Sequence, residues 1–217
     1  MTEEWMDKWT EEQREVYEII KDSKVTVNLV TKENGKFKIQ LAHIFFMSGL
    51  IRDMIELDDT KEIVKRAEML KKRKEKEEKE GKKEEIEIQP PDEIEIPLPN
   101  LTNKGIIPIS EYAKHHFENL PDPLERPLKS RSIKNIVSKW DYEFIKNPKL
   151  NQQMQVRLIK EANYLDIEPL LSLLAINFAE SLKGKTPAEI GDIFGFSNDF
   201  TPEEEAKIIE ENKHCVI

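Results

Sequence analysis

Apolar residues recur at helical spacing through the last third of the chain, from about residue 147 onward. Asn147–Pro148 is typical of a helix start, because asparagine caps the first backbone N–H groups and proline is tolerated in the first turn. This helix would carry on one side Leu150, Met154, Leu158, Ile159 and Ala162. A second helix is expected over about 167–183, with an i, i+4 stripe of Leu170, Leu174, Phe178 and Leu182. Gly184 should end it as a left-handed residue.

Two copies of one helix-start signal follow this stripe. Thr186–Glu189 and Thr201–Glu204 both combine a capping box with proline at the first helical position. The first would open a short helix with Ile190 and Phe194, and the second a last helix whose main apolar residues are Ile208 and Ile209. Within and between these helices lie three phenylalanines, Phe194, Phe196 and Phe200. Helices this short cannot bury three such side chains by themselves. Either these side chains pack in the chain's own core, or they form a surface that an amphipathic segment of another protein completes.

The first 57 residues combine helical and strand patterns. Residues 2–21 are expected to be helical, with a capping box from Thr10 to Gln13 and apolar residues near one face. Residues 24–31 alternate between apolar and polar positions, and Asn34–Gly35 favours a tight turn into a returning strand over 37–41. Short helices should follow over 44–47 and 49–57. Three interpretations of the first helix stay open: it packs on its own domain or frays, it covers an apolar patch, or it mediates self-association.

The middle of the chain begins with a tract rich in lysine and glutamate, residues 58–85. Its mixed charges favour a solvated helix or a disordered loop. Residues 93–98 alternate as a strand, and 100–117 should be helical, with Pro108 expected to kink or restart the helix. The prolines in 119–138 indicate a linker, and 140–145 a short helix that docks the C-terminal helices onto the first part.

Composition and charge exclude several function classes. The net charge is −9, and an acidic chain is a poor candidate for binding nucleic acid, which depends on lysine and arginine contacts. The single cysteine, Cys215, excludes an intramolecular disulfide and fits a reducing compartment. No apolar run reaches membrane-spanning length, and Cys215 stands third from the last residue, where prenylation needs the fourth. We therefore expect no membrane partner, and a cytoplasmic and nuclear location.

Catalytic and metal-binding patterns are absent from the sequence. His115 and His116 are neighbours, which on a helix point about 100° apart and do not make a ligand pair on one face. Gly184–Thr186 ends a helix and lacks the earlier glycine of a phosphate-binding loop. Cys215 at the chain end has no pocket or orienting group for a nucleophile. The sequence thus predicts a protein that is not an enzyme and needs no cofactor or metal.

Several ordered motifs resemble one known family. In the C-terminal part they are Asn163–Ile167, Gly184–Pro187, Asn198–Glu205 and Glu211–Cys215. Upstream, in the same order as in the family, are Ile96–Asn100 and Trp140–Phe144. These segments closely resemble the S-phase kinase-associated protein one family, the adaptor subunits of cullin-type ubiquitin ligases. The resemblance covers roughly 24–57 and 94–215, and it departs from the family at the extra N-terminal helix and at the long charged tract.

The resemblance implies an α+β fold that is mostly helical: a BTB/POZ-like fold, in which a small sheet is wrapped by helices, with a C-terminal helical extension. Three regions are expected: an extra helix over 1–22, the BTB/POZ-like domain over 23–138 with a charged insertion over 58–92, and a C-terminal helical dimerisation region over 139–217 that binds F-box proteins. The implied function is that of an adaptor linking F-box substrate receptors to a cullin scaffold for ubiquitin-dependent degradation.

The same resemblance implies two sets of contact residues. The apolar residues expected to bind the F-box are Leu171, Leu174, Phe178, Leu182, Ile190, Phe194, Phe196, Phe200, Ile208 and Ile209. The residues expected to bind the cullin are Asn163, Tyr164, Ile106, Ile109 and Tyr112. Without a partner, weak self-association is expected.

Two residues depart from the family's pattern: Pro108, and His214 where the family has tryptophan. The His214 departure is expected to affect which receptors bind. Pro108 and the long insertions leave an alternative open, in which the chain is a binding module that engages F-box-like partners outside cullin ligases.

Overall fold

The computed structural model describes residues 6–22, 25–55, 65, 94–122, 124, 130, 132–186, 189–191 and 200–213. The contacts divide the chain into two compact units, Met1–Asn177 and Phe178–Ile217. Apart from Lys65, the predicted charged tract lies outside the described residues, as do Phe194, Phe196 and the residues from His214 onward. Each unit is described by itself.

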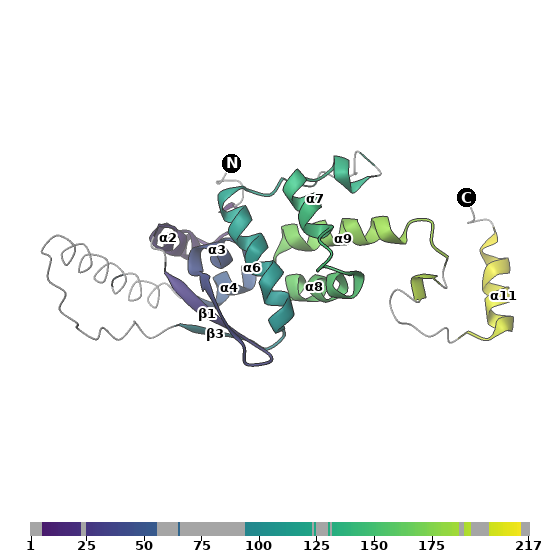
Figure 1. The fold of residues 1–217 in the computed structure, drawn as a ribbon, viewed down its shortest axis with the longest axis horizontal. Coiled ribbons are helices and arrows are strands. Elements are labelled where there is room, and N and C mark those ends of the chain that lie inside the picture. Colours follow the sequence, from purple (N-terminus) through teal and green to yellow (C-terminus); the bar gives the residue numbers. More distant parts are fainter. Residues whose placement is uncertain are drawn as a thin grey trace, which may run out of the picture. The chain divides into compact units, whose positions relative to one another are not determined.

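The first unit contains a small mixed sheet with strand order β2-β1-β3. Strands β1 (Thr26–Thr31) and β2 (Lys36–Gln40) pair antiparallel, and β3 (Glu95–Leu98) pairs parallel to β1. The predicted hairpin is confirmed, and its turn places Asn34 at φ 58°, a left-handed conformation that asparagine tolerates. Together with the helices, this sheet confirms the α+β class (Figure 1).

Three helices pack beside the sheet and contain much of the core. They are α3 (Leu41–Met47), α4 (Gly49–Met54) and α6 (Asn103–Glu118). Helix α6 contacts α3 and presents to the core Ile106, Ile109, Tyr112, Ala113 and His116. It runs through Pro108 as one helix, so of the two expected outcomes, a kink or a restart, the restart is excluded. Pro108 itself is buried against the core, which offsets the backbone hydrogen bond that a proline cannot make.

The N-terminal helix α2 (Glu11–Ile20) packs on its own unit, where it covers α3. The predicted capping box between Thr10 and Gln13 is confirmed. Trp9 is buried, with its ring edge-to-face against Phe45 and Phe46, and the Arg52 guanidinium lies 4.7 Å from its centre. Of the interpretations left open by the sequence, the structure supports the first, a helix packed on its own domain.

The next helices extend the core of the same unit. They are η1 (Ile133–Asn135), α7 (Lys139–Ile145), α8 (Gln152–Tyr164) and α9 (Glu168–Leu182). The predicted start at Asn147–Pro148 is wrong, because Asn151 caps α8 by accepting a hydrogen bond from the Met154 N–H. Asn177 is buried on α9, where it accepts from Lys146 Nζ at 2.9 Å and donates to Gln155 Oε1 at 2.7 Å. This network joins α7, α8 and α9.

The second unit contains the end of α9 and the last helix, α11 (Pro202–Glu211). Both predicted capping boxes are present, at Thr186 with Glu189 and at Thr201 with Glu204. Gly184 has φ 74°, which confirms its left-handed role after α9. The local signals for helix start and stop in this region are therefore correct.

Candidate protein-interaction surfaces

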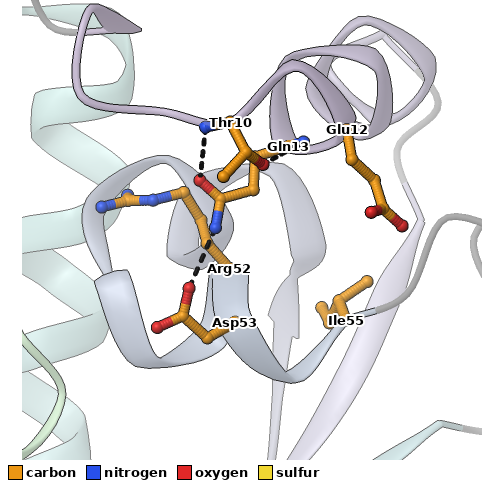
Figure 2. Close-up of a pocket in the computed structure, with 6 residues that line it drawn as sticks. All are labelled: Thr10, Glu12, Gln13, Arg52, Asp53 and Ile55. Carbon is orange, nitrogen blue, oxygen red and sulfur yellow. Dashed lines mark hydrogen bonds between the residues drawn. The ribbon is translucent and has the colours of Figure 1, made fainter.

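Within the described ranges, no group of three or more His, Cys, Asp or Glu side chains could hold a metal ion, and no helix among them could span a membrane. A small hollow lies where the start of α2 meets α4 (Figure 2). Its polar groups already bond one another: the Gln13 amide accepts from the Thr10 N–H at 3.2 Å and donates to Asp53 Oδ1 at 2.9 Å. The hollow is thus part of the α2 docking contact.

The helix α11 exposes its apolar residues. The structure describes the whole of this helix, and none of its residues is buried. The exposed fractions are 41% for Ile208 and 66% for Ile209, and just before the helix 58% for Phe200. A ten-residue helix without buried side chains is only marginally stable by itself, and its capping interactions provide much of that stability. Its apolar side is therefore suited to contact another protein.

The ten residues expected at the F-box surface fall into four groups. Leu174 is fully buried in the core of the first unit, so its side chain is not exposed to a partner. Leu171 is half-buried against the same core. Phe178, Leu182 and Ile190, in the second unit, are half-buried, and Phe200, Ile208 and Ile209 are exposed. Phe194 and Phe196 lie outside the described residues.

Asn163 and Tyr164 end helix α8, with Asn163 exposed and Tyr164 half-buried. The two residues that follow are held by the start of α4. The Gly49 N–H donates to the Asp166 carbonyl at 3.1 Å, and the Ser48 hydroxyl donates to the Leu165 carbonyl. Asp166 has φ 52°, a left-handed conformation that turns the chain out of α8. Asn163 and Tyr164 therefore lie on a fixed corner of the first unit.

Glu161, two residues before this corner, is a buried carboxyl group that contacts the start of α6. Its Oε1 accepts from the Thr102 N–H at 3.1 Å and from the Thr102 hydroxyl at 2.8 Å. Its Oε2 is buried and finds no hydrogen-bond partner among the described residues. Burial raises the pKa of Glu161, and the two hydrogen bonds from Thr102 oppose the rise. Sequence reasoning missed this residue, because nothing in its local pattern distinguishes it from a solvated glutamate.

The remaining residues expected at the cullin surface, Ile106, Ile109 and Tyr112, are core residues. Their side chains pack inside the first unit, so they cannot contact a partner there. The exposed side of α6 instead carries Lys104, Ile107, Glu111 and Lys114. Ile107, 61% exposed, is an apolar candidate that the sequence analysis overlooked. The recurrence of apolar or small residues at 105, 106, 109, 112 and 113 was the signal that marks the core side.

Known proteins resemble the chain along most of its length. Residues 168–215 match the family model described as Skp1 family, dimerisation domain. An S-phase kinase-associated protein 1 homolog of Tetrahymena thermophila is 34% identical over 181 residues, which cover 83% of this chain and 95% of that protein. SCF ubiquitin ligase complex protein SKP1a of Dictyostelium discoideum is 40% identical over 120 residues, 55% of this chain and 72% of that protein. SKP1-like protein 1A of Arabidopsis thaliana is 39% identical over 118 residues, 54% of this chain and 72% of that protein. The chain therefore belongs to the Skp1 family.

Proposed function

We propose that this chain is the adaptor of an SCF-type ubiquitin ligase, in which it links F-box substrate receptors to a cullin scaffold. Membership of the Skp1 family supports this role, as do relatives described as subunits of SCF ubiquitin ligase complexes. The role is not catalytic. The adaptor forms no bond with the substrate, but it holds the receptor so that substrate lysines come close to a charged ubiquitin-conjugating enzyme.

The single observation that carries the F-box side of the proposal is the exposed apolar side of α11. Its isoleucines, Ile208 and Ile209, are well exposed, and a capping box closes the N-terminal end of the helix. Burying the exposed part of these side chains against an F-box helix would contribute at most about 1.5–3 kcal/mol each. We expect Phe178, Leu182 and Ile190, which are half-buried in the same unit, to add to this contact.

For the cullin side we propose the fixed corner with Asn163 and Tyr164. An exposed amide next to a partly exposed aromatic ring on a rigid backbone is a suitable contact for another protein, since little conformational entropy is lost on binding. Ile107, on the exposed side of α6, is a further candidate at the first unit's surface. We also propose a cytoplasmic and nuclear location, and weak self-association through α11 when no F-box protein is bound.

Binding of purified partners tests the two sides separately. An Ile209→Asp variant should lose an F-box protein and keep a cullin, while Tyr164→Ala should keep the F-box protein and lose the cullin. Lys207→Asp is the matched control for the first variant, because it places the same charge on the opposite side of α11. Undiminished F-box binding by Ile209→Asp would contradict the proposed surface. Binding of the wild-type chain to F-box proteins but to no cullin would select the alternative, a module outside cullin ligases.

A further inference from the structure

Two acidic residues flank the pair Asn163–Tyr164, Glu161 before it and Asp166 after it. Each contacts a glycine near the start of another helix. On one side Glu161 contacts Gly105 in the first turn of α6, and on the other Asp166 contacts Gly49, the first residue of α4. A side chain at either glycine would overlap the facing carboxylate. Two close approaches of the same kind therefore flank one exposed pair of residues.

The contact before the pair is made by a side chain. Thr102 is the N-cap of α6, and its backbone N–H and its hydroxyl both donate to Glu161 Oε1. The second carboxylate oxygen lies in the space that Gly105 leaves empty. The positive end of the 16-residue helix α6 favours a carboxylate at this place. The end of α8 is thus tied to the beginning of α6.

The contact after the pair is made mainly by backbone groups. Leu165 and Asp166 offer their carbonyl oxygens to Ser48 and Gly49, and the Leu50 N–H also lies 3.4 Å from the Leu165 carbonyl. The left-handed backbone of Asp166 brings its side chain over Gly49, where no Cβ obstructs it. The end of α8 is thus tied to the beginning of α4 as well.

We propose that these flanking contacts, Glu161 with Thr102 and Gly105, and Leu165–Asp166 with Ser48–Gly49, position Asn163 and Tyr164 for the cullin. The inference rests on the proposed function for the identity of the partner. Glu161 is a positioning residue, since its carboxyl group is buried and cannot itself contact a partner. The two flanking contacts leave residues 163–166 with little freedom to reorient. A contact surface that is already positioned binds more tightly than one that must be ordered on binding.

The second carboxylate oxygen of Glu161, for which the described part of the chain offers no hydrogen-bond partner, supports a positioning role. A buried carboxylate oxygen without a partner among the described residues costs stability, and an apolar side chain would avoid much of this cost. Glu161 nevertheless fills the space beside Gly105 and accepts both hydrogen bonds of Thr102. The arrangement thus fixes the spacing between α6 and α8 at the expense of stability.

Amide hydrogen exchange on the full chain tests the proposal without any partner. Glu161→Ala removes the first contact, and Ser48→Ala removes the buried hydroxyl that donates to the Leu165 carbonyl in the second. Each should raise the exchange rate of the amides over 163–166 about tenfold, while α2 keeps its protection. Glu161→Gln keeps an acceptor for Thr102 and should exchange at the wild-type rate. Glu143→Ala, which removes an exposed carboxylate of α7, is the matched control.

Cullin binding by the same variants completes the test. Glu161→Ala and Ser48→Ala should bind a purified cullin about tenfold more weakly than wild type, with F-box binding unchanged, and Glu161→Gln should bind cullin like wild type. Wild-type exchange in both of the first two variants overturns the proposal, as does faster exchange with undiminished cullin binding. If the wild-type chain binds no cullin, the proposed function fails at that step, and the exchange rates alone still decide whether the flanking contacts hold the corner.

Discussion

The carboxylate of Glu161 occupies the space that the side chain of residue 105 would fill if that residue were not glycine. Glu161 belongs to α8 and Gly105 to the first turn of α6, so this relationship joins two helices that are far apart in sequence. Glycine is an unfavourable residue within a helix, by about 1 kcal/mol relative to alanine. Its presence here is explained by the carboxylate that it admits.

A double-mutant cycle on this pair gives a first prediction. Gly105→Ala should lower the free energy of unfolding by about 1–3 kcal/mol, because its methyl group would overlap the Glu161 carboxylate. In a Glu161→Ala background the same change should instead raise the free energy of unfolding by about 0.5–1 kcal/mol, the gain in helix propensity. Urea denaturation of the four proteins measures both values. Equal effects of Gly105→Ala in the two backgrounds would show that the two residues do not interact.

The pH dependence of stability gives a second prediction. Burial raises the pKa of Glu161 in the folded chain, so folding favours the protonated carboxyl group. The resulting stability is complete below the unfolded pKa of a glutamate, about 4.3, and is lost as the pH rises through the higher folded pKa. Glu161→Gln cannot ionise and does not suffer this loss. Its free energy of unfolding should therefore rise relative to wild type with increasing pH over that window, and then level off.

Urea denaturation of both proteins at a series of pH values from about 4 to about 8 measures this difference. Glu143→Gln, at an exposed position of α7, should show little change relative to wild type across the same range. A constant difference between Glu161→Gln and wild type would contradict the prediction.

Trp9 gives a third prediction, about the extra N-terminal helix. Its ring is buried among Phe45, Phe46 and Tyr17, under the Arg52 guanidinium. Trp9→Ala should lower the free energy of unfolding by about 3 kcal/mol and expose α2 to proteolysis. Chemical denaturation and limited proteolysis measure the two effects, with Glu15→Ala on the exposed side of α2 as the control. Wild-type behaviour in both assays would mean that α2 does not cover the aromatic face in solution.

A buried polar pair between α6 and α7 gives a fourth prediction. His116 Nε2 lies 3.0 Å from Asp141 Oδ1, and the Ser138 hydroxyl donates to the other oxygen of Asp141 at 2.8 Å. Asp141→Ala leaves His116 inside the core and the half-buried Ser138 without their acceptor, so the free energy of unfolding should fall by about 3 kcal/mol. Thermal unfolding measures the loss against Glu143→Ala, an exposed carboxylate of the same helix. Equal melting temperatures for the two variants would be the contrary result.

Local signals in the sequence predicted most elements of the fold. The capping boxes at Thr10 and Thr201, the turn at Asn34 and the glycine at Gly184 depend on neighbouring residues alone, and each is confirmed. The wrong helix start shows where this local reasoning fails. Asn147 accepts from the Lys149 N–H at 3.0 Å and forms a turn of its own, so the true cap falls to Asn151 one turn later. Two asparagines could cap, and only the tertiary packing of α8 decides between them.

The residues of the candidate site were harder to predict from the sequence than the fold was. The spacing of apolar residues along α6 indicates which side of the helix is buried. It does not indicate whether that side is buried by the chain's own core or by a partner protein. Ile106, Ile109 and Tyr112 proved to face the core, and Leu174 likewise. Glu161 and Gly105 are 56 positions apart in the sequence, and no local sequence pattern predicts their contact. The exposed isoleucines of α11, in contrast, followed from the low apolar content of that helix.

The most direct test of the adaptor account measures whether this chain brings a cullin to an F-box protein. With a purified F-box protein immobilised and a purified cullin in solution, wild-type chain should make cullin capture possible, in proportion to the chain bound. Ile208→Asp with Ile209→Asp should abolish capture because the chain no longer binds the surface, and Tyr164→Ala should bind the surface without bringing the cullin. Two results would contradict the account. One is that wild-type chain binds the immobilised F-box protein but captures no cullin, and the other is that the double variant captures as much cullin as wild type.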